Sequence, residues 1–207
     1  MRILVIDTAT KACSVALYDS DVVIASYHEV IGRGHAERLL PLIAKLPDSG
    51  KADRIVVDVG PGSFTGIRIG VAAARALGLA WDVEVKGYGC LTLVAAMARQ
   101  AVGINTAVDV VMAGGHGEYF FETFDPQDLS PVGAKSLTPQ MLAQQSQASV
   151  VAGDVGADVA AIVGDREFID ILPDAACWHL IASLPALAPN PNYGRAPDAK
   201  LPKVKLA

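Results

Sequence analysis

The stretch RIVVDVGPGSFTGIRIG (Arg54–Gly70) joins an apolar run, a glycine-rich turn and the start of a second apolar run. The run over 54–59 is rich in β-branched residues, which predicts a strand, and the run over 67–80 has the composition of a helix. A glycine-rich turn between a strand and a helix holds phosphate in many proteins. The first question is therefore whether this turn binds phosphate or has a structural role.

The turn matches neither of the two common phosphate-binding motifs. A Walker loop requires G-x-x-x-x-G-K-[ST], whereas Ile67 and Arg68 follow Gly66 here. The dinucleotide fingerprint requires G-x-G-x-x-G, and this turn has one residue too many before its last glycine. We therefore interpret it as a rigid turn that sets up an interface helix. The predicted glycine loop comprises Gly60, Pro61, Gly62, Ser63, Phe64, Thr65 and Gly66.

The remaining sequence predicts two halves with the same order of elements. In the first half we expect strands at 2–7, 13–18, 22–30, 54–59 and 83–87, and helices at 35–46, 67–80 and 90–101. In the second half we expect strands at 107–112, 118–124, 132–136 and 148–154, a helix that starts at Pro139, and helical stretches at 155–162 and 166–188.

A three-stranded meander continued by strand–helix units resembles the ribonuclease-H-like arrangement. Two such units side by side resemble the actin-like ATPase (ASKHA) fold. We therefore predict an α/β protein with mixed sheets in two ribonuclease-H-like halves, 1–104 and 105–207, the second with an extended tail. The resemblance implies a nucleotide site between the halves.

Composition and charge narrow the classes of function. The net charge is −5, and the only basic cluster is Arg195, Lys200, Lys203 and Lys205 in the tail. Such a cluster would assist nucleic-acid binding without driving it, because phosphate neutralisation carries most of that affinity.

Every apolar run in the sequence is much shorter than a membrane-spanning helix, which needs about 20 residues. The apolar run before Asp7 is too short for a signal peptide, so we expect a cytoplasmic protein without a membrane contact. Cys13, Cys90 and Cys177 are far apart in sequence and favour buried free thiols over a disulfide framework.

Two helices have features of an interface. The 35–46 helix has more apolar residues than one stripe needs, so some should face outward and mark an interface. Gly66, Gly70, Ala74 and Gly78 form a small-residue face on the next helix, which would allow close approach of either the chain's own sheet or a helix of another chain. Arg68 opposes the helix dipole and favours contact with an acidic partner or an anion. The predicted interface comprises Leu39, Leu40, Leu42, Ile43, Leu46, Ile67, Arg68, Gly70, Val71, Ala74 and Gly78.

Four blocks of the sequence resemble the TsaB (YeaZ) family: ILVIDTATKACSVAL (3–17), HAERLLPLI (35–43), GPGSFTGIRIG (60–70) and PNYGR (191–195). The resemblance implies a non-catalytic scaffold subunit, required by the catalytic relative TsaD for synthesis of threonylcarbamoyladenosine on bacterial tRNA. It also implies TsaE as a further partner, tRNA contact only through the complex, and a homodimer when alone. No cofactor is expected on the isolated chain, with ATP or ADP expected at the joint surface of the complex.

The sequence departs from the family pattern in the second-half hairpin, MAGGHGEYFF (112–121). Ala113 stands where the family has Asp, and Gly115 stands where it has Arg, whereas Glu118 and Tyr119 match. In the tail motif, Gly194 replaces a leucine. The change at 113 removes a carboxylate from a hairpin that handles phosphate and metal in active actin-like ATPases, and this disfavours independent catalysis.

Candidate catalytic groups are few. Asp7, Thr8 and Thr10 are either a vestigial nucleotide hairpin or a strand end that caps its own turn, and the sequence leaves both open. His35 has Leu39 at i+4, so the helical histidine pair that binds metal in the catalytic relative is missing, and we expect no metal site. A stand-alone actin-like ATPase or small-molecule kinase is the alternative hypothesis, and a metallopeptidase is a weaker one.

Overall fold

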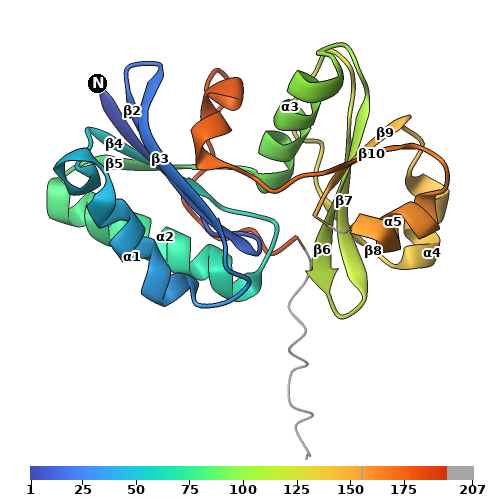
Figure 1. The fold of residues 1–207 in the computed structure, drawn as a ribbon, viewed down its shortest axis with the longest axis horizontal. Helices are drawn as coiled ribbons and strands as arrows, with labels where there is room; N and C mark the ends of the chain where they lie inside the picture. Colours follow the sequence, from blue (N-terminus) through green and yellow to red (C-terminus); the bar gives the residue numbers. More distant parts are fainter. Residues whose placement is uncertain (155, 195–207) are drawn as a thin grey trace, which may run out of the picture.

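The computed structural model comprises 207 residues, of which 1–154 and 156–194 are described. The four cations of the predicted basic tail lie outside the described residues. Two five-stranded mixed sheets lie side by side, one built mainly from each half of the chain (Figure 1). The predicted α/β class with a mixed sheet in each half is therefore confirmed.

The first sheet has the strand order β3-β2-β1-β4-β5. Its strands are β1 (Arg2–Asp7), β2 (Ala12–Asp19), β3 (Val22–Val30), β4 (Arg54–Asp58) and β5 (Glu84–Tyr88). The first three pair antiparallel as a meander, and β4 and β5 add in parallel. The central strand β1 is apolar on both faces because both faces are covered, whereas the edge strand β3 alternates between exposed and half-buried residues.

The second sheet repeats this order as β8-β7-β6-β9-β10. Its strands are β6 (Val108–Gly115), β7 (Glu118–Phe124), β8 (Lys135–Leu137), β9 (Val150–Gly153) and β10 (Glu167–Asp170). The predicted helix over 166–188 is wrong. The chain forms β10, parallel to β9, and then a 3-10 helix, η2 (Ala175–Ile181). Four residues of strand are too short to impose a clear period of two on the sequence.

Helices cover the outer faces of both sheets and the space between them (Figure 1). Helices α1 (His35–Lys45) and α2 (Phe64–Trp81) cover one face of the first sheet, with a 3-10 turn η1 (Pro47–Gly50) after α1. Helix α3 (Cys90–Val102) lies between the sheets and contacts β6, β7, β9 and η2. Helices α4 (Pro139–Gln145) and α5 (Gly156–Val163) pack on the second sheet. Thr138 caps α4 as predicted.

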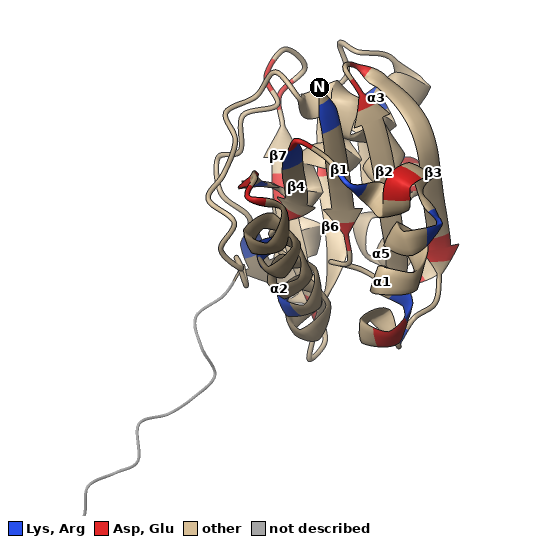
Figure 2. Ribbon diagram, turned by 90° about the vertical axis from the view of Figure 1, so that its left-hand side faces the viewer, with Lys and Arg blue, Asp and Glu red and all other residues tan. Residues whose placement is uncertain are grey.

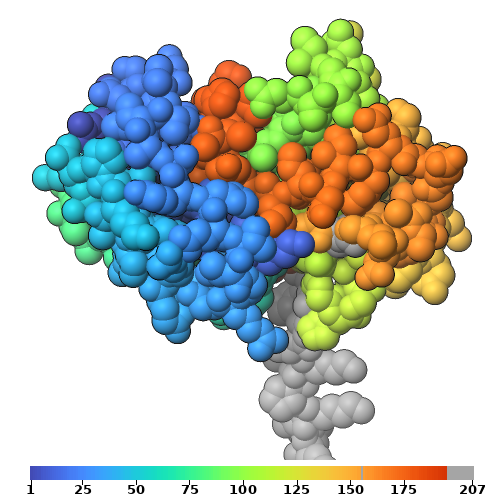
Figure 3. Space-filling view, viewed as in Figure 1, coloured from blue at the N-terminus to red at the C-terminus, as the bar shows by residue number. Residues whose placement is uncertain are grey.

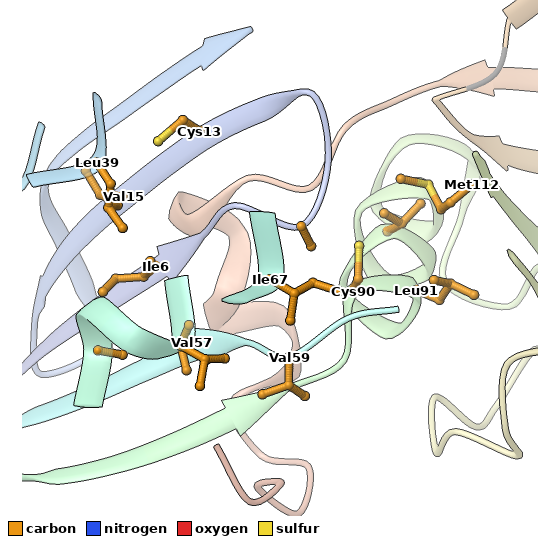
Figure 4. Packing of buried hydrophobic residues seen from close by; sticks show 14 of the residues in the cluster. Ile6, Cys13, Val15, Leu39, Val57, Val59, Ile67, Cys90, Leu91 and Met112 are labelled. Carbon is orange, nitrogen blue, oxygen red and sulfur yellow. The ribbon is translucent and has the colours of Figure 1, made fainter. Parts of the chain in front are cut away.

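One apolar core runs from the first sheet into the second through α3. Figure 4 shows Ile6, Val57 and Ile67 packed together, with Cys90 of α3 and Met112 of β6 continuing the cluster. The three cysteines are free, and Cys13 and Cys90 are buried. The core thus ties the halves together near the first turn of α3.

The C-terminal segment returns to the first sheet. Gly87 and Leu187 exchange backbone hydrogen bonds of 2.8 and 2.9 Å, and the Tyr18 hydroxyl donates to the Ala176 carbonyl at 2.8 Å. The space-filling view shows this segment, in red-orange, between the halves (Figure 3). The predicted division at 104/105 therefore gives the second half residues that pack on the first sheet.

Candidate functional site

The glycine loop (Gly60–Gly66) packs against the turn that follows β1. The Ser63 amide donates to the Ala9 carbonyl at 2.6 Å, and the Thr8 hydroxyl donates to the Gly66 carbonyl at 2.7 Å. A Cβ at Gly62 would lie 2.2 Å from the Ala9 oxygen, and one at Gly66 would lie 2.0 Å from the Thr8 oxygen. Glycine is required at both positions because two backbones touch there.

Several amides of the loop are engaged within it. The Gly60 amide donates to Asp58 Oδ1 at 2.6 Å, and the Gly66 amide donates to Ser63 Oγ at 3.2 Å. Ser63 therefore caps α2, which begins at Phe64 rather than at the predicted Ile67. A phosphate cradle needs free amides that point at the ligand. These contacts favour the structural role for the loop.

The residues of the first hairpin make local contacts. Asp7 Oδ1 accepts from the Ala9 amide at 3.2 Å, and Thr10 Oγ1 accepts from the Ala12 amide at 3.1 Å. With Thr8 bonded to the glycine loop, all three residues serve turns of the chain itself. Of the two interpretations left open by the sequence, these contacts favour the strand end that caps its own turn.

Two carboxyl groups meet beneath the loop, where the neighbouring strands β1 and β4 end. Asp7 and Asp58 are both fully buried. The Tyr88 hydroxyl donates to Asp7 Oδ2 at 2.9 Å, whereas Asp58 Oδ2 has no hydrogen-bond partner. Burial raises the pKa of both groups, and the charge of Asp7 raises the pKa of Asp58 further, well above its ordinary value.

The raised pKa favours the protonated form of Asp58 in the folded protein. Its unpartnered Oδ2 then becomes a donor, which a buried carboxylate oxygen cannot be. Asp58 was not among the residues predicted from the sequence, although its place just before the glycine loop, at a strand end, was a usable signal. No local pattern pairs it with Asp7, because the pairing depends on the parallel contact of β1 and β4.

A second cluster joins the glycine loop to the tail motif. The Arg68 guanidinium carbon lies 3.7 Å from the Phe64 ring centroid, and the Tyr193 ring lies 4.7 Å from the Phe64 ring, between centroids. Arg68 Nε donates to the Tyr193 hydroxyl at 2.8 Å. Phe64 is thereby partly covered, as its position in a tight turn required, but its side chain remains 52% exposed.

Most of the predicted interface residues are core residues. Only Leu40, at 52%, and Arg68 are exposed. The prediction is corrected for Leu39, Leu42, Ile43, Leu46, Ile67, Gly70, Val71, Ala74 and Gly78, which are buried within the chain. The small-residue face lies on the chain's own sheet. A Cβ at Gly70 would lie 2.4 Å from Thr8 Oγ1, and one at Gly78 would lie 2.4 Å from Val85 Cγ2.

The outward face of α2 is nevertheless mostly uncharged. Ala72, Ala76 and Leu79 are exposed there, Leu79 at 86%. Figure 2 shows that α2 presents few charged residues on this side, and the charged residues of its sequence are Arg68 and Arg75. The neighbouring helix α1 exposes Leu40 together with Glu37 and Lys45. A mostly apolar outer face on α2, continued by an exposed leucine of α1, is typical of an interaction surface.

A cavity of about 510 Å³ separates the first hairpin and glycine loop from the β6–β7 hairpin. Lys11, Phe64, Tyr193 and Asp154 are among its lining residues. Lys11 Nζ lies 3.4 Å from the Asp154 carbonyl oxygen, and the Ala113 amide donates to Asp154 Oδ1 at 3.1 Å. We call this cavity the cleft.

The two departures from the family pattern lie on one wall of the cleft. Ala113 borders the Asp154 carboxyl, whose pKa is raised by burial, so an aspartate at 113 would add a second carboxylate there. Gly115 has φ +75° and open space around it, so the hairpin turn uses a conformation that favours glycine. In the tail, Gly194 has φ +66°, and a Cβ there would lie 2.7 Å from both Pro61 Cβ and the Phe120 ring.

Within residues 1–154 and 156–194, no group of three His, Cys, Asp or Glu side chains is placed to hold a metal ion. In the same residues no helix is long and apolar enough to cross a membrane.

Two ribonuclease-H-like sheets that flank such a cleft define the actin-like ATPase fold. The structure of the ethanolamine utilization protein EutJ from Carboxydothermus hydrogenoformans shares this fold, with a TM-score of 0.51 at 11% identity over 88% of this chain and 89% of that one. YeaZ from Pseudomonas aeruginosa is far more similar, with a TM-score of 0.78 at 26% identity over 93% of this chain and all of the other.

Sequence comparison agrees with this likeness. The family model described as TsaD, tRNA N6-adenosine threonylcarbamoyltransferase, matches residues 22–153. The tRNA threonylcarbamoyladenosine biosynthesis protein TsaB of Escherichia coli is 43% identical over 55% of this chain and 49% of its own length. TsaB of Bacillus subtilis is 37% identical over 50% and 48%. The chain belongs to the TsaB (YeaZ) family, and it spans about half the length of the curated relatives it matches.

Proposed function

We propose that this chain is the scaffold subunit that a catalytic TsaD relative requires for threonylcarbamoyl transfer to adenosine in the tRNA anticodon loop. Family membership supports the pathway, because the curated relatives are named for threonylcarbamoyladenosine biosynthesis. The observation that carries the scaffold role is the mostly uncharged outer face of α2 with its exposed Leu79, beside the exposed Leu40 of α1. Burying each leucine would contribute about 1.5–3 kcal/mol to association.

We further propose that the chain alone does not catalyse the transfer. The candidate groups of the first hairpin are committed to the fold, since Asp7 Oδ1 accepts from the Ala9 amide and the Thr8 hydroxyl donates to the Gly66 carbonyl. In the glycine loop, the amides of Ser63 and Gly66 are likewise bonded, to the Ala9 carbonyl and to Ser63 Oγ. Such groups would need to break buried hydrogen bonds before they reached a substrate.

The remaining partners follow from the same proposal. We propose that TsaD binds the α1–α2 face, that a second copy of the chain uses this face when TsaD is absent, and that TsaE joins the assembled complex. The tRNA would be bound by the complex rather than by this acidic chain, and the complex would act in the cytoplasm. ATP or ADP would bind at the joint surface.

A stand-alone actin-like ATPase remains the second candidate because of one observation. The cleft is large enough for a ligand, and Lys11 in its wall could neutralise a phosphate. Hydrolysis of ATP by the isolated chain would favour this candidate.

A transfer assay tests the scaffold proposal. The TsaD relative and a threonylcarbamoyl donor are incubated with unmodified tRNA, with and without this chain, and the modified nucleoside is quantified by mass spectrometry. We expect modification only when both proteins are present. Equal modification without this chain would overturn the proposal, and modification by this chain alone would overturn its non-catalytic part.

A further inference from the structure

A second cavity lies on the side of the first sheet opposite α1 and α2. Its volume is about 350 Å³, and it lies between β4, β5 and the C-terminal segment that contains η2. Its lining residues come from neither α1, α2 nor the glycine loop. We call it the β5 cavity. It is separate from the cleft and from the surface assigned to TsaD.

Two cations line the β5 cavity. Arg54 begins β4, Lys86 lies in β5, and the parallel register pairs Arg54 with Glu84 and Val56 with Lys86. Because side chains alternate along a strand, Arg54, Val56 and Lys86 all project on the face that η2 covers. The cations therefore meet at one end of the cavity through the register of the sheet.

Within the part of the chain that the structure describes, one carboxylate is paired with these two cations, that of Glu84. Glu84 Oε2 lies 3.4 Å from Arg54 Nε, and Glu84 Oε1 lies 3.3 Å from Lys86 Nζ. The set of three charges has a net charge of +1. An anion in the cavity would complete the neutralisation.

Arg54 also has an unused hydrogen-bond donor. Its Nε is buried and has no hydrogen-bond partner, because the contact with Glu84 lacks the required geometry. Buried polar groups nearly always have a partner, so each exception points to a missing ligand, water or ion. The Nε itself is closed to solvent, so a ligand in the cavity would meet the exposed part of the Arg54 side chain, which is 35% exposed.

The rest of the wall is mostly apolar and fixes the class of ligand. Trp178, Leu184 and Pro185 line it, with the Thr92 and Ser130 side chains as further polar contacts. A volume of about 350 Å³ is near the lower end of ligand pockets and corresponds to about a dozen water molecules. We propose that the β5 cavity binds a small organic anion, with its carboxylate or phosphate at Arg54 and Lys86 and its apolar body on Trp178.

Tryptophan fluorescence provides the test, because the chain has two tryptophans and only Trp178 lines this cavity. The full chain with Trp81→Phe is titrated with 3-phenylpropanoate, with phenyl phosphate and with the neutral 3-phenylpropanol, at constant ionic strength. We expect a saturable change with at least one anion and a much weaker response to the alcohol. The two anions distinguish a carboxylate site from a phosphate site.

Variants assign the effect to the cations. Arg54→Gln and Lys86→Gln are each made in the Trp81→Phe background, with Lys51→Gln, an exposed lysine outside the cavity, as the matched control. Loss of a hydrogen bond to a charged group should weaken binding by about tenfold to hundredfold. Lys51→Gln should leave the affinity unchanged.

Three results would overturn the proposal. These are the absence of a saturable change with either anion at about 10 mM, equal affinity for the alcohol, or unchanged affinity in both cavity variants. Thermal unfolding of each variant shows whether it is folded. If Arg54→Gln does not fold, Lys86→Gln alone decides, because Lys86 is 35% exposed and its ion pair is with the exposed Glu84.

Discussion

Arg68 Nε donates a hydrogen bond of 2.8 Å to the hydroxyl oxygen of Tyr193, and this bond joins two motifs that lie 125 positions apart in the sequence. The same guanidinium covers the Phe64 ring. The glycine loop, the first turn of α2 and the tail motif are thus one surface feature. Arg68 is exposed within it and available to a partner.

We predict that Arg68→Glu weakens assembly with the TsaD relative by tenfold or more while changing the free energy of unfolding by less than about 1 kcal/mol. The lost hydrogen bond to Tyr193 costs about 0.5–1.5 kcal/mol, and the lower part of this range applies because Arg68 is exposed. Titration calorimetry and urea unfolding measure the two effects. Lys51→Glu, at an exposed position outside α1 and α2, is the control. Unchanged assembly would remove Arg68 from the interface.

A second prediction concerns the exposed leucine of α1. Leu40→Asp should abolish self-association and weaken the complex with the TsaD relative, because Leu40 is 52% exposed and lies on the proposed face. Its effect on stability should be small, since exposed substitutions change it by about 0.5 kcal/mol or less. Val132→Asp, at an apolar position 91% exposed in the second half, should leave both forms of association intact. Sedimentation velocity measures the self-association and the complex formation of each variant. Equal association of the two variants would contradict the assigned surface.

The small-residue face gives a third prediction. Alanine is a better helix former than glycine by about 1 kcal/mol, yet Gly70→Ala should destabilise the protein by about 1–3 kcal/mol. The new methyl group would lie 2.4 Å from Thr8 Oγ1, which is held by its bond to the Gly66 carbonyl.

Urea unfolding measures this effect, with Ala76→Gly as the companion variant at an exposed position of α2. That variant should lose about 1 kcal/mol from helix propensity alone. A Gly70→Ala protein more stable than the parent would mean that the face is open and awaits another chain.

The fourth prediction is a pH dependence from the buried carboxyl pair. The pKa of Asp58 is raised in the folded state, so folding favours its protonated form. Stability from this group is full at low pH and is lost as the pH rises above the ordinary aspartate pKa of about 4. Asp58→Asn cannot ionise and should accept from Gly60 as before. At pH 8 it should be more stable than the parent by about 1 kcal/mol or more.

Unfolding at a series of pH values from about 4 to 8 tests this prediction. The advantage of Asp58→Asn should shrink toward the acid end, where the parent is protonated as well. Asp21→Asn, at an exposed position, should follow the parent at every pH. If the free energy of unfolding of Asp58→Asn followed that of the parent at a constant difference over this pH range, Asp58 would be ionised in the folded protein.

Local patterns predicted most of the fold. The strands of the first meander have the expected places because their apolar runs are long and their turns are short and polar. The local sequence signal for secondary structure was weaker in the second half. β10 has four residues, and the apolar residues after it belong to η2 rather than to an α-helix. Its pairing with β9 is a tertiary contact that overrides a weak local signal.

The candidate site was less predictable than the fold. The residue type of a leucine on a helix does not show whether it packs on the chain's own sheet or on a partner. The sequence therefore could not distinguish the buried Leu39 from the exposed Leu40. The pairing of Asp58 with Asp7 and the contact of Arg68 with Tyr193 both arise from segments distant in sequence. No local pattern contains such information.

The most direct measurement is size-exclusion chromatography with light scattering, on this chain alone and mixed with the TsaD relative. We predict a homodimer alone and a 1:1 complex in the mixture, with the homodimer displaced because both use the α1–α2 face. Two separate species that ignore each other in the mixture would contradict the scaffold role.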